Sequence, residues 1–231
     1  VAGEEGLPPA VARIIDGLKA RGFQPESGTP AESPAYAGSK ESSSTPRYGE
    51  RKQVTVMCSD LSGYTAMNEK LDPEEVKEIM DKIFGQISRV VIKYEGYTEN
   101  FAGDTVMAVF GVPRTHEDDP VRAIRAAREI HHLVKETGSS LGETIGKPLC
   151  MHTGINTGLV VAKEIDFEKG APGVLGYTID VASRIAGLAE TDEIIVSLET
   201  YHQAEGFFNF EKLDPVKTGG AEKPLHVFKV S

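Results

Sequence analysis

Two aspartates lie where short strand-like runs end or turn. Asp60 closes a run in which apolar and polar side chains alternate from Val54, and Asp104 lies in a Gly103-Asp104 turn between two apolar runs. Two carboxylates with few other ligands suit Mg²⁺, which fills its remaining positions with water and substrate phosphates. If the flanking strands are neighbours, both carboxylates reach one edge of a sheet and can share cations. The alternative that Asp60 caps a strand and Asp104 serves a turn stays open at this point.

A short polar segment follows the first aspartate. Ser62, Gly63, Tyr64 and Thr65 come directly before a helical pattern, so their backbone N–H groups and hydroxyls form a potential anion site. A Ser-Gly turn is common and says little by itself. Beside a pair of metal-binding carboxylates, the same segment could help to hold a polyphosphate.

A third candidate pair lies later in the chain. Asp180 and Arg184 are four residues apart, which places both on one face of a helix. Spacing alone is equally compatible with a surface ion pair worth a few tenths of a kcal/mol.

These residues need a scaffold, and the hydrophobic pattern predicts one. The clearest helix starts at Asp72-Pro73, where Asp72 suits the N-cap and Glu75 completes a capping box, and it ends at Gly96. The order β-α-β-β-α-β predicts a ferredoxin-like core in the α+β class, followed by a further helix and strands. The expected elements are strand 51–60, helix 73–95, strands 97–102 and 105–110, a helix from 119, strand 149–162, helix 178–190, strand 193–197, and strand runs 207–213 and 224–230.

Composition limits the classes of function. The 231 residues carry a net charge of −10, which disfavours binding to nucleic acid phosphates. No apolar run approaches the ~20 residues that span a bilayer, so membrane insertion is not expected. Cys58 and Cys150 lie in strand-like runs and are expected to be buried free thiols in a reducing compartment.

The chain is predicted to have three parts. Residues 1–24 contain a short helical segment, residues 25–47 are a Ser/Pro-rich flexible linker, and residues 48–231 form the main domain. The start lacks both a basic signal-peptide region and an initiator Met, so we expect a piece of a larger multidomain chain.

Four motifs in order resemble one family. They are Val56-Met-Cys-Ser-Asp60-Leu-Ser-Gly-Tyr-Thr65, Phe101-Ala-Gly-Asp104-Thr-Val-Met-Ala-Val-Phe-Gly111, Met151-His-Thr-Gly-Ile-Asn-Thr-Gly158 and the segment 176–184. Together they resemble the catalytic domain of class III nucleotidyl (adenylate/guanylate) cyclases, especially bacterial members of the soluble-adenylyl-cyclase-like branch. The resemblance covers about residues 48–231.

The resemblance implies an adenylate cyclase that makes cyclic AMP and pyrophosphate from ATP in the cytoplasm. It implies a head-to-tail homodimer with shared active sites, in which Asp60, Asp104 and the Leu61 carbonyl hold two Mg²⁺ or Mn²⁺ ions. Arg184 would reach the transition-state phosphate from the partner chain, since a planar guanidinium suits phosphoryl oxygens. Asp180 occupies the position of a ribose-orienting Asn.

The base-recognition positions depart from the family pattern. Asn100 stands where adenine-specific members carry Lys, and Gly173, at the second base-selecting position, offers no side chain. The triphosphate-binding lysine corresponds to Lys217 or Lys223. These departures predict loose selectivity between ATP and GTP. A guanylate cyclase and a nucleotide-binding or dimerising regulatory domain with little turnover therefore remain alternatives.

Overall fold

The computed structural model describes residues 50–162, 174–175, 177–216 and 224–231. The predicted helical segment 1–24 and linker 25–47 lie outside these residues. The described elements follow one another as β1 (Glu50–Ser62), α2 (Tyr64–Lys70), α3 (Pro73–Lys93), β2 (Gly96–Ala102), β3 (Thr105–Phe110), α4 (Asp119–Ile145), β4 (Cys150–Ala162), β5 (Val174–Leu175), α5 (Tyr177–Ala186), β6 (Ile194–Ser197), α6 (Leu198–Ala204), β7 (Phe210–Lys212) and β8 (Val227–Val230).

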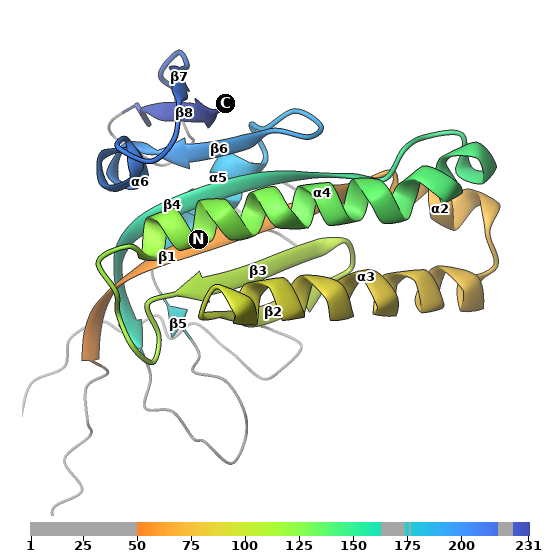
Figure 1. The fold of residues 1–231 in the computed structure, drawn as a ribbon, viewed down its shortest axis with the longest axis horizontal. Coiled ribbons are helices and arrows are strands. Elements are labelled where there is room, and N and C mark those ends of the chain that lie inside the picture. Colours follow the sequence, from red (N-terminus) through yellow and green to blue (C-terminus); the bar gives the residue numbers. More distant parts are fainter. Residues whose placement is uncertain (1–49, 163–173, 176, 217–223) are drawn as a thin grey trace, which may run out of the picture.

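One mixed sheet organises the molecule (Figure 1). Its strands lie in the order β2-β3-β1-β4-β6-β8-β7, and β5 pairs with β4. The two long central strands, β1 and β4, pair antiparallel along their whole length. The predicted ferredoxin-like α+β core is confirmed, with β1, β2, β3 and β4 as its strands and α3 and α4 as its helices.

Alternation along β1 sends side chains to two different cores. Met57 and Leu61 pack with the apolar faces of α3 and α4, whereas Val56 and Cys58 pack on the other side of the sheet with Ala182 of α5. The sheet is therefore covered by α3 and α4 on one face and by α5 on the other. Asp60 follows the even-numbered set and belongs to the α5 side.

The predicted start of the long helix is confirmed in detail. Asp72 and Glu75 form the capping box, with the backbone N–H of Asp72 donating to a Glu75 carboxylate oxygen at 3.2 Å, and Pro73 opens the helix. This pair satisfies N–H groups that the first helical turn leaves without intrahelical partners.

Several boundaries differ from the sequence-based expectations. β1 continues past Asp60 to Ser62 because its pairing with β4 extends to Cys150. Two short helices, α2 and α6, were not predicted; the N-cap of α6 is Ser197, whose hydroxyl accepts a hydrogen bond from the N–H of Thr200 at 3.3 Å. The helix expected over 178–190 ends at residue 186, and the last two strands are shorter than expected.

Within the described ranges, every helix is too short or too polar to cross a membrane.

Candidate active site

The structure brings Asp60 and Asp104 to one edge of the sheet. β1 pairs with β3, and Asp60 lies opposite Thr105, the residue after Asp104. The N–H of Leu61 also donates to the backbone carbonyl of Asp104 at 3.1 Å. Gly103 has a φ of +65°, which lets the β2–β3 connection turn tightly at this point. Backbone hydrogen bonds therefore connect the two segments that carry these carboxylates.

A hydrogen bond from Thr105 holds the Asp60 side chain, which is 13% exposed, and a histidine lies near it. The hydroxyl of Thr105 donates to Oδ1 in a short hydrogen bond, and Nε2 of His152 lies 3.6 Å from Oδ2. His152 stands opposite Asp60 in the β1–β4 ladder, and its Nδ1 lies 3.2 Å from the Ser62 hydroxyl. Sequence reasoning did not identify Thr105 or His152. Only the register of the ladders, which no local pattern reveals, places them beside Asp60.

The segment Ser62–Thr65 is not the open loop that the sequence suggested. Ser62 is the last residue of β1 and its hydroxyl contacts His152, while Tyr64 packs against the apolar core. Gly63 has a φ of +95°, and a Cβ there would lie 2.9 Å from Leu149, so the connection from β1 to α2 requires glycine. The exposed Thr65, in the first turn of α2, is the one of these side chains that faces solvent.

The oxygen ligands at this edge suit a divalent cation that has few protein ligands. Two carboxylates and the backbone carbonyl of Leu61 are hard oxygen ligands, which Mg²⁺ and Mn²⁺ prefer. In the part of the chain that the structure describes, no group of three or more His, Cys, Asp or Glu side chains forms a cage that could hold a metal by itself. Mg²⁺ at nucleotide sites is commonly bound by one or two carboxylates, with phosphates and water as the other ligands.

α5 is fixed on β4 by close backbone contact. A Cβ on Gly154 would lie 2.1 Å from the Ala186 nitrogen and 2.4 Å from the Ala182 carbonyl, so only glycine allows this approach. The side-chain amide of Asn156 donates to the Thr178 carbonyl at 2.9 Å, and the Thr178 hydroxyl donates to a β4 carbonyl at 2.8 Å. The glycines that interrupt this strand in the sequence are thus explained by helix docking.

Docking leaves Asp180 and Arg184 on the far side of α5. Ala182 and Ala186 face the sheet, and residues two positions away on a helix point in nearly the opposite direction. Asp180 is exposed and Arg184 is half-buried. Partial desolvation raises the pKa of the Asp180 carboxyl, and the nearby Arg184 guanidinium opposes this shift. The pair therefore faces away from the sheet on which its own helix packs.

Cys58 is buried in β1, two residues before Asp60, and its thiol is unreactive. Burial raises the pKa of its thiol, and the negative charges of Asp60 and Asp180 raise it further. A thiol held in its neutral form is a poor nucleophile and a poor metal ligand. Cys58 and Cys150 are both buried and free, as predicted.

The base and phosphate positions are only partly described. Asn100 lies on β2 opposite Met107, just after an irregularity in the β2–β3 pairing. Gly173, Lys217 and Lys223 lie outside the described residues. The roles expected for these four residues stay predictions.

Comparison with protein families finds one match over most of the chain. Residues 47–230 match the family described as the adenylate and guanylate cyclase catalytic domain. Adenylate cyclase 1 of Rhizobium meliloti is 27% identical over 184 residues, covering 78% of this chain and 28% of that protein. The receptor-type guanylate cyclase gcy-23 of Caenorhabditis elegans is 29% identical over 147 residues, covering 63% of this chain and 14% of that protein. The chain thus spans less than a third of these two relatives.

Solved structures show the same fold. The adenylyl cyclase CyaB from P. aeruginosa superposes with a TM-score of 0.73 at 27% identity, covering 79% of this chain and 95% of the other. The guanylyl cyclase Cya2 superposes with a TM-score of 0.72 at 31% identity, covering 79% and 93%. Structures of both specificities are therefore similar to this chain to nearly the same degree.

Proposed function

Because this chain belongs to the family of adenylate and guanylate cyclase catalytic domains, we propose that it converts ATP to 3′,5′-cyclic AMP and pyrophosphate. The observation that carries this proposal is the position of Asp60 and Asp104 at one edge of the sheet. The backbone hydrogen bond from Leu61 to Asp104 connects the two segments that carry them. Two partly buried carboxylates on a hydrogen-bonded backbone suit a reaction in which the protein mainly positions charge.

In the proposed reaction the ribose 3′-hydroxyl oxygen bonds to the α-phosphorus and loses its proton, while the bond to pyrophosphate breaks. Two Mg²⁺ or Mn²⁺ ions, held by Asp60, Asp104 and the Leu61 carbonyl, would supply charge neutralisation and lower the pKa of the attacking hydroxyl. The Thr105 hydroxyl donates to the Asp60 carboxylate and holds it in place. The Arg184 guanidinium would stabilise charge on the transferred phosphoryl group.

We place the active site between two copies of the chain. Asp180 and Arg184 sit on the face of α5 that points away from its own sheet, alongside Tyr177, which is 60% exposed. A two-fold dimer that presents this face to the Asp60 edge of the partner would complete two equivalent sites. In such a dimer Asp180 can accept a hydrogen bond from a ribose hydroxyl.

Selectivity for ATP over GTP is expected to be loose. The amide of Asn100 can both donate and accept hydrogen bonds, so it can pair with an adenine or a guanine edge, and Gly173 adds no side chain. A guanylate cyclase is the second candidate, because relatives of both specificities match. A nucleotide-binding regulatory domain with little turnover is the third candidate. The departures from the family pattern at the base-recognition positions Asn100 and Gly173 favour it.

The proposal also includes the larger protein to which this domain belongs and its location in the cell. Since the chain spans 28% of its Rhizobium relative, we expect it to act within a larger protein, with other modules regulating it. Use of ATP and two reduced cysteines indicate a cytoplasmic location.

Measuring cyclic nucleotide formation from ATP and GTP in parallel, with Mg²⁺ and with Mn²⁺, tests the function. We expect cyclic AMP as the main product and measurable cyclic GMP, with a ratio of kcat/KM below about 10⁴, the level that strict hydrogen-bond discrimination reaches. Cyclic GMP as the main product would establish the second candidate. Absence of both products from a dimer that binds nucleotide would establish the third.

A further inference from the structure

One histidine lies directly beside the carboxylate of Asp60. His152 is the cross-strand partner of Asp60 in the β1–β4 ladder, so both side chains are on the α5 side of the sheet. Nε2 of His152 lies 3.6 Å from Oδ2 of Asp60, and the two side chains are 22% and 13% exposed. Ions from solvent can therefore reach both atoms.

The separation of these two atoms is too long for a hydrogen bond. It is close to the spacing of two ligands on one cation. With metal–ligand distances of about 2.1 Å, neighbouring ligands lie about 3.0 Å apart at a right angle and about 3.4 Å apart at a tetrahedral angle. A small shift of either side chain would let one ion contact both atoms. Oδ1 of Asp60 already accepts a hydrogen bond from Thr105, so Oδ2 is the oxygen that remains for the ion.

The second ring nitrogen decides which form of the imidazole faces Asp60. Nδ1 of His152 lies 3.2 Å from the Ser62 hydroxyl, which can accept a hydrogen bond from it. With the proton on Nδ1, the lone pair is on Nε2, the atom nearest to Asp60. Metal-binding histidines almost always donate their other ring N–H to an acceptor, because this fixes the tautomer and the orientation of the ring.

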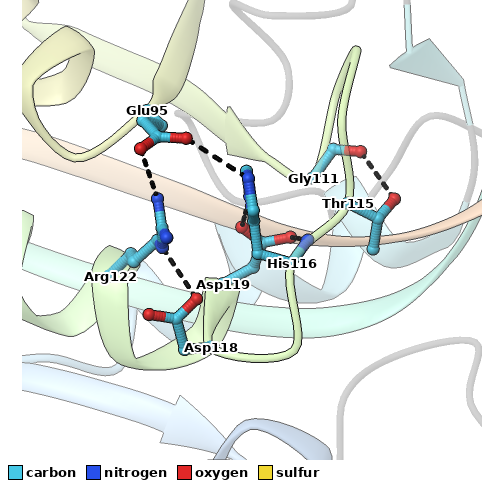
Figure 2. A network of polar contacts seen from close by, with 7 residues as sticks. All are labelled: Glu95, Gly111, Thr115, His116, Asp118, Asp119 and Arg122. Carbon is cyan, nitrogen blue, oxygen red and sulfur yellow. Dashed lines mark hydrogen bonds and ion pairs between the residues drawn. The ribbon is translucent and has the colours of Figure 1, made fainter.

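Other histidines that lie beside carboxylates are engaged on both ring nitrogens. Figure 2 shows the ring of His116 between two carboxylates, with Nδ1 3.2 Å from Asp119 and Nε2 3.2 Å from Glu95. His131 is buried, and each of its ring nitrogens has a partner. His152 differs from both, because one of its nitrogens faces a carboxylate oxygen across a gap that an ion can bridge.

A nitrogen ligand changes which cations a site prefers. Oxygen ligands suit Mg²⁺, whereas imidazole is a good ligand for first-row transition metals. Among these metals, the affinity of a given set of nitrogen and oxygen ligands rises from Mn²⁺ to Co²⁺. A site made of carboxylates and carbonyls alone lacks this source of selectivity.

We propose that His152 is a ligand of the cation that Asp60 holds, and that it makes this site select Mn²⁺ or Co²⁺ over Mg²⁺. The cation contacts Nε2 of His152 and Oδ2 of Asp60, and water or phosphate oxygens complete its coordination. This inference rests on the proposed function, in which Asp60 binds a divalent cation, and adds one nitrogen ligand to that site.

Pulsed electron paramagnetic resonance of the chain with Mn²⁺ alone tests the proposal, because it detects a ¹⁴N nucleus bound directly to the ion. We expect an imidazole ¹⁴N signal from the wild type, which changes to a ¹⁵N pattern when the chain is produced with ¹⁵N-labelled histidine. His152→Gln should abolish the signal, and His132→Gln, which alters an exposed histidine of α4, should keep it. Labelling leaves the protein unchanged, so this readout holds even if His152→Gln folds poorly.

Metal affinities give the second readout. The resonance of free Mn²⁺ reports how much Mn²⁺ is bound, and competition reports the affinity for Mg²⁺. His152→Gln should weaken Mn²⁺ binding by about tenfold and change Mg²⁺ binding by less than about twofold, because Gln offers an oxygen in place of the nitrogen.

The outcomes separate this inference from the proposed function. Three results would overturn the inference alone: Mn²⁺ binding that depends on Asp60 but shows no histidine nitrogen, a signal that survives in His152→Gln, or equal losses of affinity for both ions. Mn²⁺ binding that Asp60→Asn leaves unchanged, or no Mn²⁺ binding up to about 10 mM, would contradict the proposed function as well.

Discussion

The backbone N–H of Leu61 donates to the backbone carbonyl of Asp104 at 3.1 Å, which ties the end of β1 to the turn between β2 and β3. Asp60 precedes Leu61, so backbone hydrogen bonds fix the relative positions of the two segments that carry Asp60 and Asp104. The β1–β3 ladder continues this link with Asp60 opposite Thr105. Replacing either carboxylate should therefore change the chemistry of the site without changing its frame.

Asp104→Asn is expected to abolish most of the turnover. The amide cannot supply the negative charge that a divalent cation needs, so kcat should fall by on the order of 10²–10³-fold. Asp104 is half-exposed in a turn, and the melting temperature should change little. Asp81→Asn, in an exposed residue of α3, is the matched control and should keep full activity. Near-normal turnover by Asp104→Asn at saturating Mn²⁺ would contradict the assignment of this residue.

Thr105→Val tests whether Asp60 must be held in one orientation. The substitution keeps the shape of the side chain but removes the hydroxyl that donates to Asp60. Partners that orient metal ligands typically contribute 10–100-fold to metal affinity or activity, so the concentration of Mn²⁺ needed for half-maximal rate should rise by about tenfold or more.

Thr105→Ser retains the donor and should restore most of the metal affinity. A merely structural role for Thr105 predicts another pattern, in which both variants lower stability and neither changes the metal dependence. Metal titrations of activity, together with denaturant unfolding, separate the two.

Gly154→Ala is expected to push α5 away from the sheet. The new Cβ would meet backbone atoms of Ala182 and Ala186, which cannot move aside as a flexible side chain can. Overpacking of this kind costs about 1–3 kcal/mol in the free energy of unfolding, and activity should fall because α5 carries Asp180 and Arg184. Gly85→Ala is the control: nothing lies within 4 Å of the new Cβ on α3, so the variant should be about 0.5–1 kcal/mol more stable. Equal stability of the two variants would contradict the close docking of α5.

The sequence predicts the core of this fold well because its signals are local. The capping box at Asp72 and the hairpin around Gly103-Asp104 are fixed by neighbours in the chain, and the structure reproduces both. Asp60 and Asp104 could be placed on one edge because β-α-β-β-α-β topology brings these strand ends together.

What the sequence does not reveal depends on contacts between distant segments. His152 and Thr105 come to Asp60 through strand register, and a shift of one residue would turn them to the other face. The extension of β1 to Ser62 likewise depends on its pairing with β4. Residues 64–70 form the helix α2, which was not predicted. So short a helix depends on tertiary packing, here the burial of Met67, and short local patterns do not reveal such packing.

His131 should make the domain less stable in mild acid. Burial lowers the pKa of its imidazole to about 4, while the unfolded chain binds the proton at about 6.5. The stabilisation due to neutral His131 is thus fully present above pH 6.5 and is lost as the pH falls toward 4. Between these values the free energy of unfolding should fall by about 1.4 kcal/mol per pH unit from this residue.

Denaturant unfolding of the wild type and of His131→Asn between pH 7.5 and 4.5 checks this expectation. The substitution should lower stability at pH 7, because it disrupts the contact of His131 with the Thr153 hydroxyl at 2.8 Å, and should flatten the acid slope. His132→Asn alters the neighbouring, exposed histidine and should leave the slope as it is. An unchanged slope in His131→Asn would show that other groups cause the acid sensitivity.

Mixing two inactive chains tests the central claim most directly, namely that Asp60 of one chain and Arg184 of its partner build one cyclase site. In a heterodimer of Asp60→Ala with Arg184→Ala both defects fall in the same site, so the second site is intact. With free subunit exchange half of the dimers are mixed, and about a quarter of the wild-type cyclic nucleotide formation should return. A mixture of Asp60→Ala with Asp104→Ala is the control and should stay inactive, because each site then lacks one carboxylate. Failure of the first mixture to recover, with subunit exchange demonstrated by native mass spectrometry, would contradict the shared site.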